Sequence, residues 1–128
     1  GCKTALATMS YRTGVMHVLT SLGIEDELDL ILTREDVENA KPDPEIYLLD
    51  ARPLGLEPED CIVLENSLNG LRAGVAAGMN VLAVATPFTM AGLHSSEVLD
   101  HPWVVHDPEK LVEAVSARIA EHDRTAHG

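Results

Sequence analysis

Residues 56–84, LEPEDCIVLENSLNGLRAGVAAGMNVLAV, contain the pattern that decides the fold class. The apolar run that ends at Leu64 has the length of a buried strand, and Glu65 follows it directly. A helix-like segment then opens at Asn66 or Ser67, and a second apolar run closes the stretch. Two such runs joined by a helix predict parallel neighbouring strands. The carboxylate at the end of a buried strand needs a chemical reason.

The rest of the chain continues this alternation of strands and helices. Gly23 is the predicted stop of the first helix, and Pro53 should end the second helix at or before Arg52. Continuous apolar strands that alternate with helices predict an α/β, doubly wound domain with a parallel sheet covered on both faces. We expect one domain over 1–128, with a frayed tail at 123–128. The other predicted strands are 3–10, 28–33, 80–86 and 103–107, and the predicted helices are 12–23, 44–55, 67–78 and 108–122.

Length, charge and hydropathy limit the possible functions. The chain has 128 residues, of which 45% are hydrophobic, enough for one compact core. Its formal net charge of −12 argues against nucleic acid or an anionic membrane as a general partner, because phosphates need a basic surface. No apolar stretch approaches the length of a membrane span, and no signal peptide is visible. We therefore expect a cytoplasmic protein.

Polar side chains follow the predicted strands where each strand ends. Ligands of open parallel sheets bind at this carboxyl edge. A hydroxyl and backbone N–H groups bind phosphate oxygens, a lysine neutralises their charge, and carboxylate and amide oxygens suit Mg²⁺. The edge therefore suits a phosphate and a divalent cation. The residues concerned are Thr8, Met9, Ser10, Arg34, Glu35, Asp36, Lys41 in the loop that follows, Glu65, Asn66, Ser67, Thr86 and Pro87.

Two segments, ALATMS and AKPDPEIYLLDARPLGLEPEDCIVLENSLNGLRAGVAAGMNVLAV, carry a family resemblance. Together they resemble the haloacid dehalogenase-like (HAD) hydrolase superfamily, in the subfamily of β-phosphoglucomutase-like and phosphoglycolate phosphatases. The resemblance covers roughly residues 4–87. It implies a Rossmann-like core and a Mg²⁺-dependent phosphatase or mutase. Such an enzyme would act on a small phosphorylated metabolite through a phosphoaspartate.

The resemblance also assigns roles to individual residues. Thr8 matches the motif II hydroxyl that binds the transferring phosphoryl group, and Met9 and Ser10 beside it would contact the substrate. Lys41 matches the motif III lysine that stabilises charge during the reaction. Glu65 and Asn66 occupy the motif IV pair that positions Mg²⁺. The second motif IV position is usually Asp, so the uncharged Asn66 implies weaker metal affinity.

The larger departure from the family pattern concerns motif I. The family's nucleophile lies in a D-x-D motif on an earlier strand, and no D-x-D precedes Thr8. Family topology implies that this strand lies mid-sheet, between the strands that end at Thr8 and Glu65, and the substrate-selecting cap would also precede residue 1. Without the strand, the sheet has a gap with costly unpaired backbone groups. We therefore expect a fragment, or a second chain that supplies the missing half, and no activity from the isolated chain.

Other interpretations stay open from the sequence. Thr8 or Ser10 is a possible cap of the helix that follows it, and Asn66 a possible N-cap of the next. A receiver-type signalling module also uses acids, a hydroxyl and a lysine, but the chain order Thr8, Lys41, Glu65 is the HAD order. A catalytically inactive remnant that serves as an interaction domain is the third possibility. The substrate, the choice between phosphatase and mutase, and the oligomeric state are not encoded in recognisable motifs.

Overall fold

The computed structural model describes residues 2–85 and 104–127. Its strands and α-helices alternate as the sequence predicts, so the α/β class is confirmed. Short 3-10 turns lie between several of these elements. In chain order the strands and α-helices are β1 Ala5–Ala7, α1 Arg12–Leu22, β2 Leu30–Leu32, α2 Glu45–Ala51, β3 Ile62–Glu65, α3 Leu68–Ala76, β4 Asn80–Val84, β5 Val104–Val105 and α5 Leu111–His127.

Local sequence signals set most helix ends. α1 stops where Gly23 adopts a left-handed conformation with φ of 68°, which lets its N–H reach the carbonyls of Leu19 and Thr20. α2 ends one residue before Arg52, consistent with the block imposed by Pro53. α3 begins after Ser67, whose hydroxyl accepts the N–H of Gly70 at 3.0 Å. Of the two N-caps that the sequence left open for this helix, Ser67 is confirmed and Asn66 is wrong.

The described strands form two separate parallel sheets. β1 pairs with β2, with Ala5 opposite Leu30. β3 pairs with β4, which pairs with β5. Within residues 2–85 and 104–127, β1 and β3 are not paired with each other. The expected break in the sheet is therefore present between these two strands.

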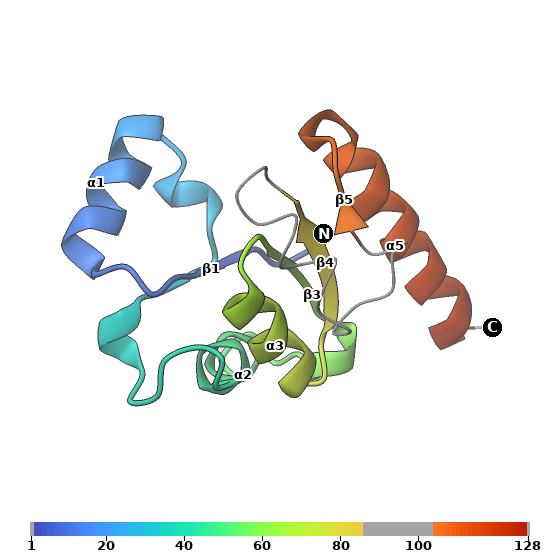
Figure 1. The fold of residues 1–128 in the computed structure, drawn as a ribbon, viewed down its shortest axis with the longest axis horizontal. Coiled ribbons are helices and arrows are strands. Elements are labelled where there is room, and N and C mark those ends of the chain that lie inside the picture. The colour runs from blue at the N-terminus through green and yellow to red at the C-terminus, as the bar shows by residue number, and fades with distance from the viewer. Residues whose placement is uncertain (1, 86–103, 128) are drawn as a thin grey trace.

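The helices surround the strands on different sides (Figure 1). α2 and α3 lie below the strands in this view, α1 lies beyond β1, and α5 lies beside β4 and β5. The main core is formed by buried side chains from α2, α3, β3 and β4, with Ile46 and Leu71 almost completely buried. α1 buries Val15 and Leu19 on its own inner face. The larger sheet and α2 thus carry most of the hydrophobic stabilisation.

At the C-terminal end, α5 and β5 differ in extent from the elements predicted there. The tail expected to fray is helical as far as His127, because α5 continues through it. The Thr125 hydroxyl donates to the carbonyl of His122, and the His122 ring lies 2.9 Å from a carboxylate oxygen of Asp60. The strand predicted over 103–107 covers Val104–Val105, and Trp103 lies outside the described residues.

None of the helices described here is long and apolar enough to cross a membrane.

Asp50 on α2 is the unusual member of the core. Its side chain is 9% exposed, and its Oδ1 atom has no hydrogen-bond partner. Burial raises the pKa of Asp50 to about 7, although the nearby positive charge of Lys41 opposes that shift. Tyr47 and Cys61 also lie within range of its charge. The folded chain therefore holds a proton here that the unfolded chain loses near pH 4.

We expect Asp50→Asn to make the chain more stable above pH 7. The pKa is higher in the folded state, so stability falls as pH rises from about 4 to about 7 and then stays low. The amide carries no charge, and the gain at pH 8 should be about 1–3 kcal/mol. Urea unfolding at pH 5 and pH 8 measures it, with exposed Asp123→Asn as the control. Equal pH dependence in wild type and Asp50→Asn would contradict the interpretation.

Candidate functional site

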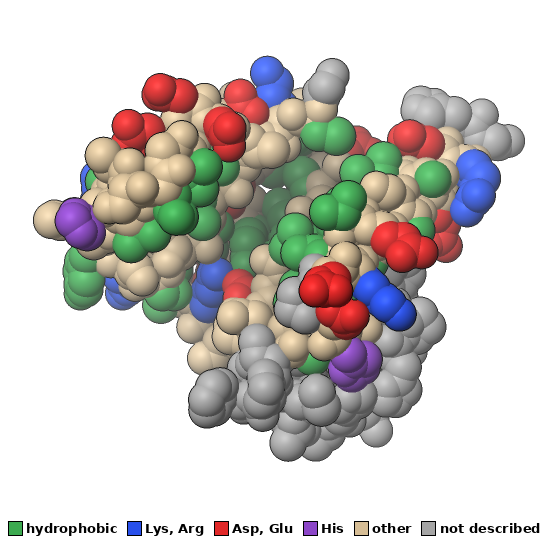
Figure 2. Space-filling model, turned by 90° about the horizontal axis from the view of Figure 1, so that it is seen from above, with side chains coloured by type: hydrophobic (Ala, Val, Ile, Leu, Met, Phe, Trp, Pro, Cys, Tyr) green, Lys and Arg blue, Asp and Glu red, His purple; other side chains and the backbone are tan. Residues whose placement is uncertain are grey.

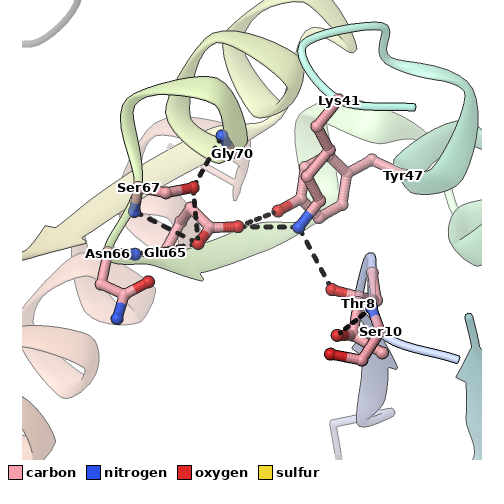
Figure 3. Close-up of polar contacts among 9 residues, drawn as sticks. Thr8, Ser10, Lys41, Tyr47, Glu65, Asn66, Ser67 and Gly70 are labelled. Carbon is pink, nitrogen blue, oxygen red and sulfur yellow. Dashed lines mark hydrogen bonds and ion pairs between the residues drawn. The ribbon is translucent and has the colours of Figure 1, made fainter. Parts of the chain in front are cut away.

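Lys41 and Glu65 form a buried ion pair at the carboxyl ends of the strands. The ammonium Nζ lies 2.8 Å from Oε2 of Glu65, and the two side chains are 8% and 12% exposed. The same Nζ donates to the carbonyl of Ala7, the last residue of β1, at 3.2 Å. Since Glu65 is the last residue of β3, one ammonium joins the ends of the two separate sheets (Figure 3).

Glu65 accepts hydrogen bonds on both of its carboxylate oxygens. Oε2 receives the ammonium of Lys41 and the hydroxyl of Tyr47, each at 2.8 Å. Oε1 receives the backbone N–H of Asn66 at 3.0 Å, and the N–H and hydroxyl of Ser67 at 3.3 Å each. Five donors therefore hold this carboxylate, which satisfies the charge that burial would otherwise penalise.

These contacts determine the protonation states of the cluster. Burial by itself would raise the pKa of Glu65, but the hydrogen bonds from Lys41 and Tyr47 outweigh it and hold that pKa below its ordinary value. Burial, together with the charge of Glu65, raises the pKa of Tyr47 well above its usual range. Glu65 is therefore ionised at neutral pH, and the phenol stays protonated and able to donate.

Thr8, Met9 and Ser10 follow β1 and line the same hollow as Lys41 and Glu65. The Thr8 hydroxyl accepts the backbone N–H of Ser10 at 3.1 Å, which fixes the turn after the strand. Met9 packs against the main core from a partly buried position. The sequence prediction thus placed these three residues correctly at the sheet edge that holds Lys41 and Glu65.

The alternative role of Thr8 or Ser10 as a helix cap is wrong. The residue at the N-cap of α1 is Tyr11, and its side chain makes no capping hydrogen bond. The N–H of Arg12 is instead bonded by a carboxylate oxygen of Glu35 at 2.5 Å. Glu35 lies in the turn after β2, so a tertiary contact supplies what a local hydroxyl was expected to supply.

A hollow of about 720 Å³ opens between the ends of β1 and β3. Figure 2 shows it as a cleft between two parts of the molecule, with hydrophobic side chains on its walls. Its polar lining includes Thr8, Lys41 and Glu65. The rest of the lining is mixed and comprises Leu6, Ala7, Met9, Ser10, Leu64, Ser67, Leu68 and Asn69.

Asn66 occupies a different position from the other predicted site residues. Its side chain points away from the Lys41–Glu65 pair in Figure 3. It lines a second, smaller hollow with Leu64, Glu65 and Val84. Its backbone N–H, rather than its side chain, contacts Glu65. Thr86 and Pro87, which the sequence also places at the sheet edge, lie outside the described residues.

Two residues of the site escaped the sequence analysis. Tyr47 lies on α2, and its position on the inner face of that helix was visible only as one aromatic residue among apolar neighbours. Gly70 lies in α3, and its spacing from Gly74 and Gly78 in the sequence indicates only close packing of that helix on the sheet. In the structure a Cβ at Gly70 would overlap the side chain of Glu65, at its Cγ, Cδ and Oε2 atoms. The absence of a side chain at Gly70 therefore leaves the space that this carboxylate occupies.

The donors in the described part of the chain do not by themselves fit a Mg²⁺ ion. Mg²⁺ takes six oxygen ligands in a strict octahedral geometry. Among the described residues, Glu65 is the one carboxylate that lines the larger hollow, and it is already held by five hydrogen-bond donors. Across residues 2–85 and 104–127, no group of three or more His, Cys, Asp or Glu side chains is arranged to hold a metal.

The chain is similar in sequence to haloacid dehalogenase-like hydrolases and to phosphatases. A family model described as haloacid dehalogenase-like hydrolase matches residues 1–84. The "Putative phosphatase YhcW" of Bacillus subtilis is 40% identical over 122 residues, which cover 95% of this chain and 52% of that protein. Hexitol phosphatase A of Escherichia coli is 38% identical over 73 residues, 57% of this chain and 34% of that protein.

A solved structure of a related class of enzyme has a similar fold. β-Phosphoglucomutase from Clostridium difficile superimposes with a TM-score of 0.75 at 28% identity, over 94% of this chain and 50% of that one. The chain thus spans about half the length of its B. subtilis relative and of this structure, and about a third of the E. coli phosphatase. The doubly wound, Rossmann-like core predicted from the sequence is confirmed by this likeness.

Proposed function

Because this chain belongs to the haloacid dehalogenase-like hydrolase family, we propose that it carries the phosphate-binding half of a phosphoryl-transfer site for small phosphorylated metabolites. The observation that carries the proposal is the meeting of Thr8, Lys41 and Glu65 around one hollow at the sheet edge. The phosphatase and β-phosphoglucomutase names of its relatives support this class of reaction. Family membership also argues against the receiver-type alternative.

Each residue has a role that follows from its chemistry. The Thr8 hydroxyl and the N–H groups of the turn after β1 would hold phosphoryl oxygens. Lys41 would stabilise the negative charge that grows on these oxygens during transfer, because its ammonium is held at the wall of the hollow. Glu65 would hold that ammonium in place through their ion pair. Ser10 and Met9 would shape the entrance next to Thr8.

We propose that the nucleophile comes from a strand seated between β1 and β3. These two strands run parallel to their own sheet partners and present facing edges across the hollow. An extended segment there would pair with both edges and join the two sheets. A carboxylate at its end would lie beside Lys41. Its oxygen would attack phosphorus as the ester oxygen leaves, and water or a sugar hydroxyl would then take the phosphoryl group.

Mg²⁺ belongs to this proposal as a cofactor of the completed site. Among the described residues, Asn66 offers an amide oxygen and Glu65 a carboxylate that is already held. At least one further carboxylate would have to come from the completing segment. When bound, such an ion would supply additional positive charge near the phosphoryl oxygens.

A chimera tests this proposal. We expect the chain on its own, even with Mg²⁺, not to hydrolyse p-nitrophenyl phosphate. The chain joined behind the part of the B. subtilis relative that it does not match should hydrolyse it. In that chimera Lys41→Ala and Glu65→Ala should each abolish activity, while the exposed Lys110→Ala should not. Absorbance of the released nitrophenol measures the rate, and far-UV circular dichroism checks the fold.

Three outcomes would count against the proposal. Turnover by the chain on its own, at proven purity, would show that the nucleophile is within it. Activity retained by both Lys41→Ala and Glu65→Ala would break the site assignment. An inactive wild-type chimera that is folded would favour the alternative, in which this chain is a catalytically inactive remnant that serves as an interaction domain.

A further inference from the structure

Tyr47 contacts both members of the buried ion pair, with different parts of its side chain. Its hydroxyl donates to Oε2 of Glu65 at 2.8 Å. The Lys41 ammonium lies over the face of its ring, 4.9 Å from the centroid. That ammonium is bonded to the same Oε2 atom, also at 2.8 Å. Tyr47, Lys41 and Glu65 therefore form a closed triangle of contacts (Figure 3).

This triangle restricts the direction of the ammonium. A lysine has three N–H donors, and here the carbonyl of Ala7 and Oε2 of Glu65 each accept one. The ring of Tyr47 attracts the ammonium towards its face and so limits its sideways movement. The remaining donor is then directed by the positions of the other two. Lys41 lines the hollow between β1 and β3, so this direction matters to any anion bound there.

We propose that Tyr47 is a positioning residue, which holds the Lys41 ammonium in the orientation that a bound phosphoryl group requires. The hydroxyl fixes the Glu65 oxygen to which Lys41 is bonded, and the ring supports the ammonium from one side. The ligand in this inference rests on the proposed function. The restraint of Lys41 by Tyr47 rests on the contacts alone and can be tested without any substrate.

A core-filling role is the competing explanation, because the ring is 5% exposed and packs in the main hydrophobic cluster. Phenylalanine would fill the same space and keep the ring face beneath Lys41. What phenylalanine lacks is the charge-assisted hydrogen bond to Glu65. Tyr47→Phe therefore separates the two explanations: a core-filling side chain tolerates the change, whereas a positioning hydroxyl does not.

The test compares wild type with the variants Tyr47→Phe and Tyr11→Phe. Tyr11 is the other tyrosine of the chain and is 68% exposed, so its variant serves as the control. Carbon-13 relaxation of the lysine Cε methylene groups reports how ordered each ammonium is. Exposed Lys3 and Lys110 serve as mobile references within the same sample. We expect Lys41 to be ordered in wild type and in Tyr11→Phe. In Tyr47→Phe its order should be lost towards the level of the two references.

Rates in the chimera described above give a second measurement. Tyr47→Phe should lower kcat for p-nitrophenyl phosphate about 10- to 100-fold with little change in KM, because misplacement of a charge-stabilising group acts on the transition state. An unchanged order of Lys41 in Tyr47→Phe would overturn the inference, and so would an unchanged kcat. An inactive wild-type chimera counts against the proposed function instead, while the relaxation data still decide the role of Tyr47.

Discussion

Replacing Lys41 by methionine should lower the free energy of unfolding of this chain by about 3 kcal/mol. The ammonium is the charged partner of Glu65, and both side chains are nearly buried. Methionine keeps the length of the side chain but leaves the carboxylate with an uncompensated charge, which is the costly way to break a buried ion pair. Urea unfolding followed by circular dichroism at pH 7 measures the loss.

Two further variants make this prediction specific. Lys110→Met, at an exposed position in the 3-10 turn before α5, should change stability by less than about 0.5 kcal/mol. The double variant Lys41→Met with Glu65→Gln removes both charges, so it should lose less than the sum of the two single losses. If the losses simply add, then Lys41 and Glu65 are not coupled and the ion pair is not the source of the effect.

Gly70→Ala should destabilise the chain by about 2–4 kcal/mol, although alanine is the better helix former. The new methyl group would overlap the carboxylate of Glu65. Its Cβ would lie less than 3.0 Å from atoms of that side chain, a distance that Cβ atoms in proteins essentially never show. That carboxylate cannot simply swing away, because doing so breaks its hydrogen bonds to Lys41, Tyr47 and Ser67. The cost of the lost contacts therefore exceeds the gain in helix propensity.

Gly14→Ala is the matched control for this substitution. Gly14 lies inside α1, and a Cβ there would meet no atom within 4 Å. This variant should raise stability by up to about 1 kcal/mol, the ordinary gain of alanine over glycine in a helix. Thermal or urea unfolding of both variants decides the matter. If the Gly70→Ala variant is as stable as the Gly14→Ala variant, then Glu65 is not held as the structure describes.

The sequence was sufficient to predict features that depend on local signals. The stop of α1 at Gly23, the end of α2 before Pro53 and the serine cap of α3 each follow from one residue's conformational preference. The meeting of Thr8, Lys41 and Glu65 was also predictable, because parallel strands bring their carboxyl ends to one edge. The interpretation of Glu65 was less complete, since its internal donors were not foreseen.

The remaining features depend on contacts between distant parts of the chain. Tyr47 reaches Glu65 because of the rotation of α2 about its own axis, which the apolar pattern of a seven-residue helix does not fix. Glu35 bonds the start of α1 from a turn 23 residues away. The extension of α5 through its polar end accompanies the contact of His122 with Asp60. Local propensity does not encode such pairings.

The break between β1 and β3 also sets how cooperatively this molecule can unfold. Order passes along a sheet through its ladder of backbone hydrogen bonds, and among the described residues that ladder stops at both strands. In the part of the chain that the structure describes, the links between the two sheets include the packing of α2 against β1, β2 and α3 and the ammonium of Lys41. Any segment that pairs with both edges would join two weakly coupled folding units into one, so its binding and the cooperativity of unfolding should rise together.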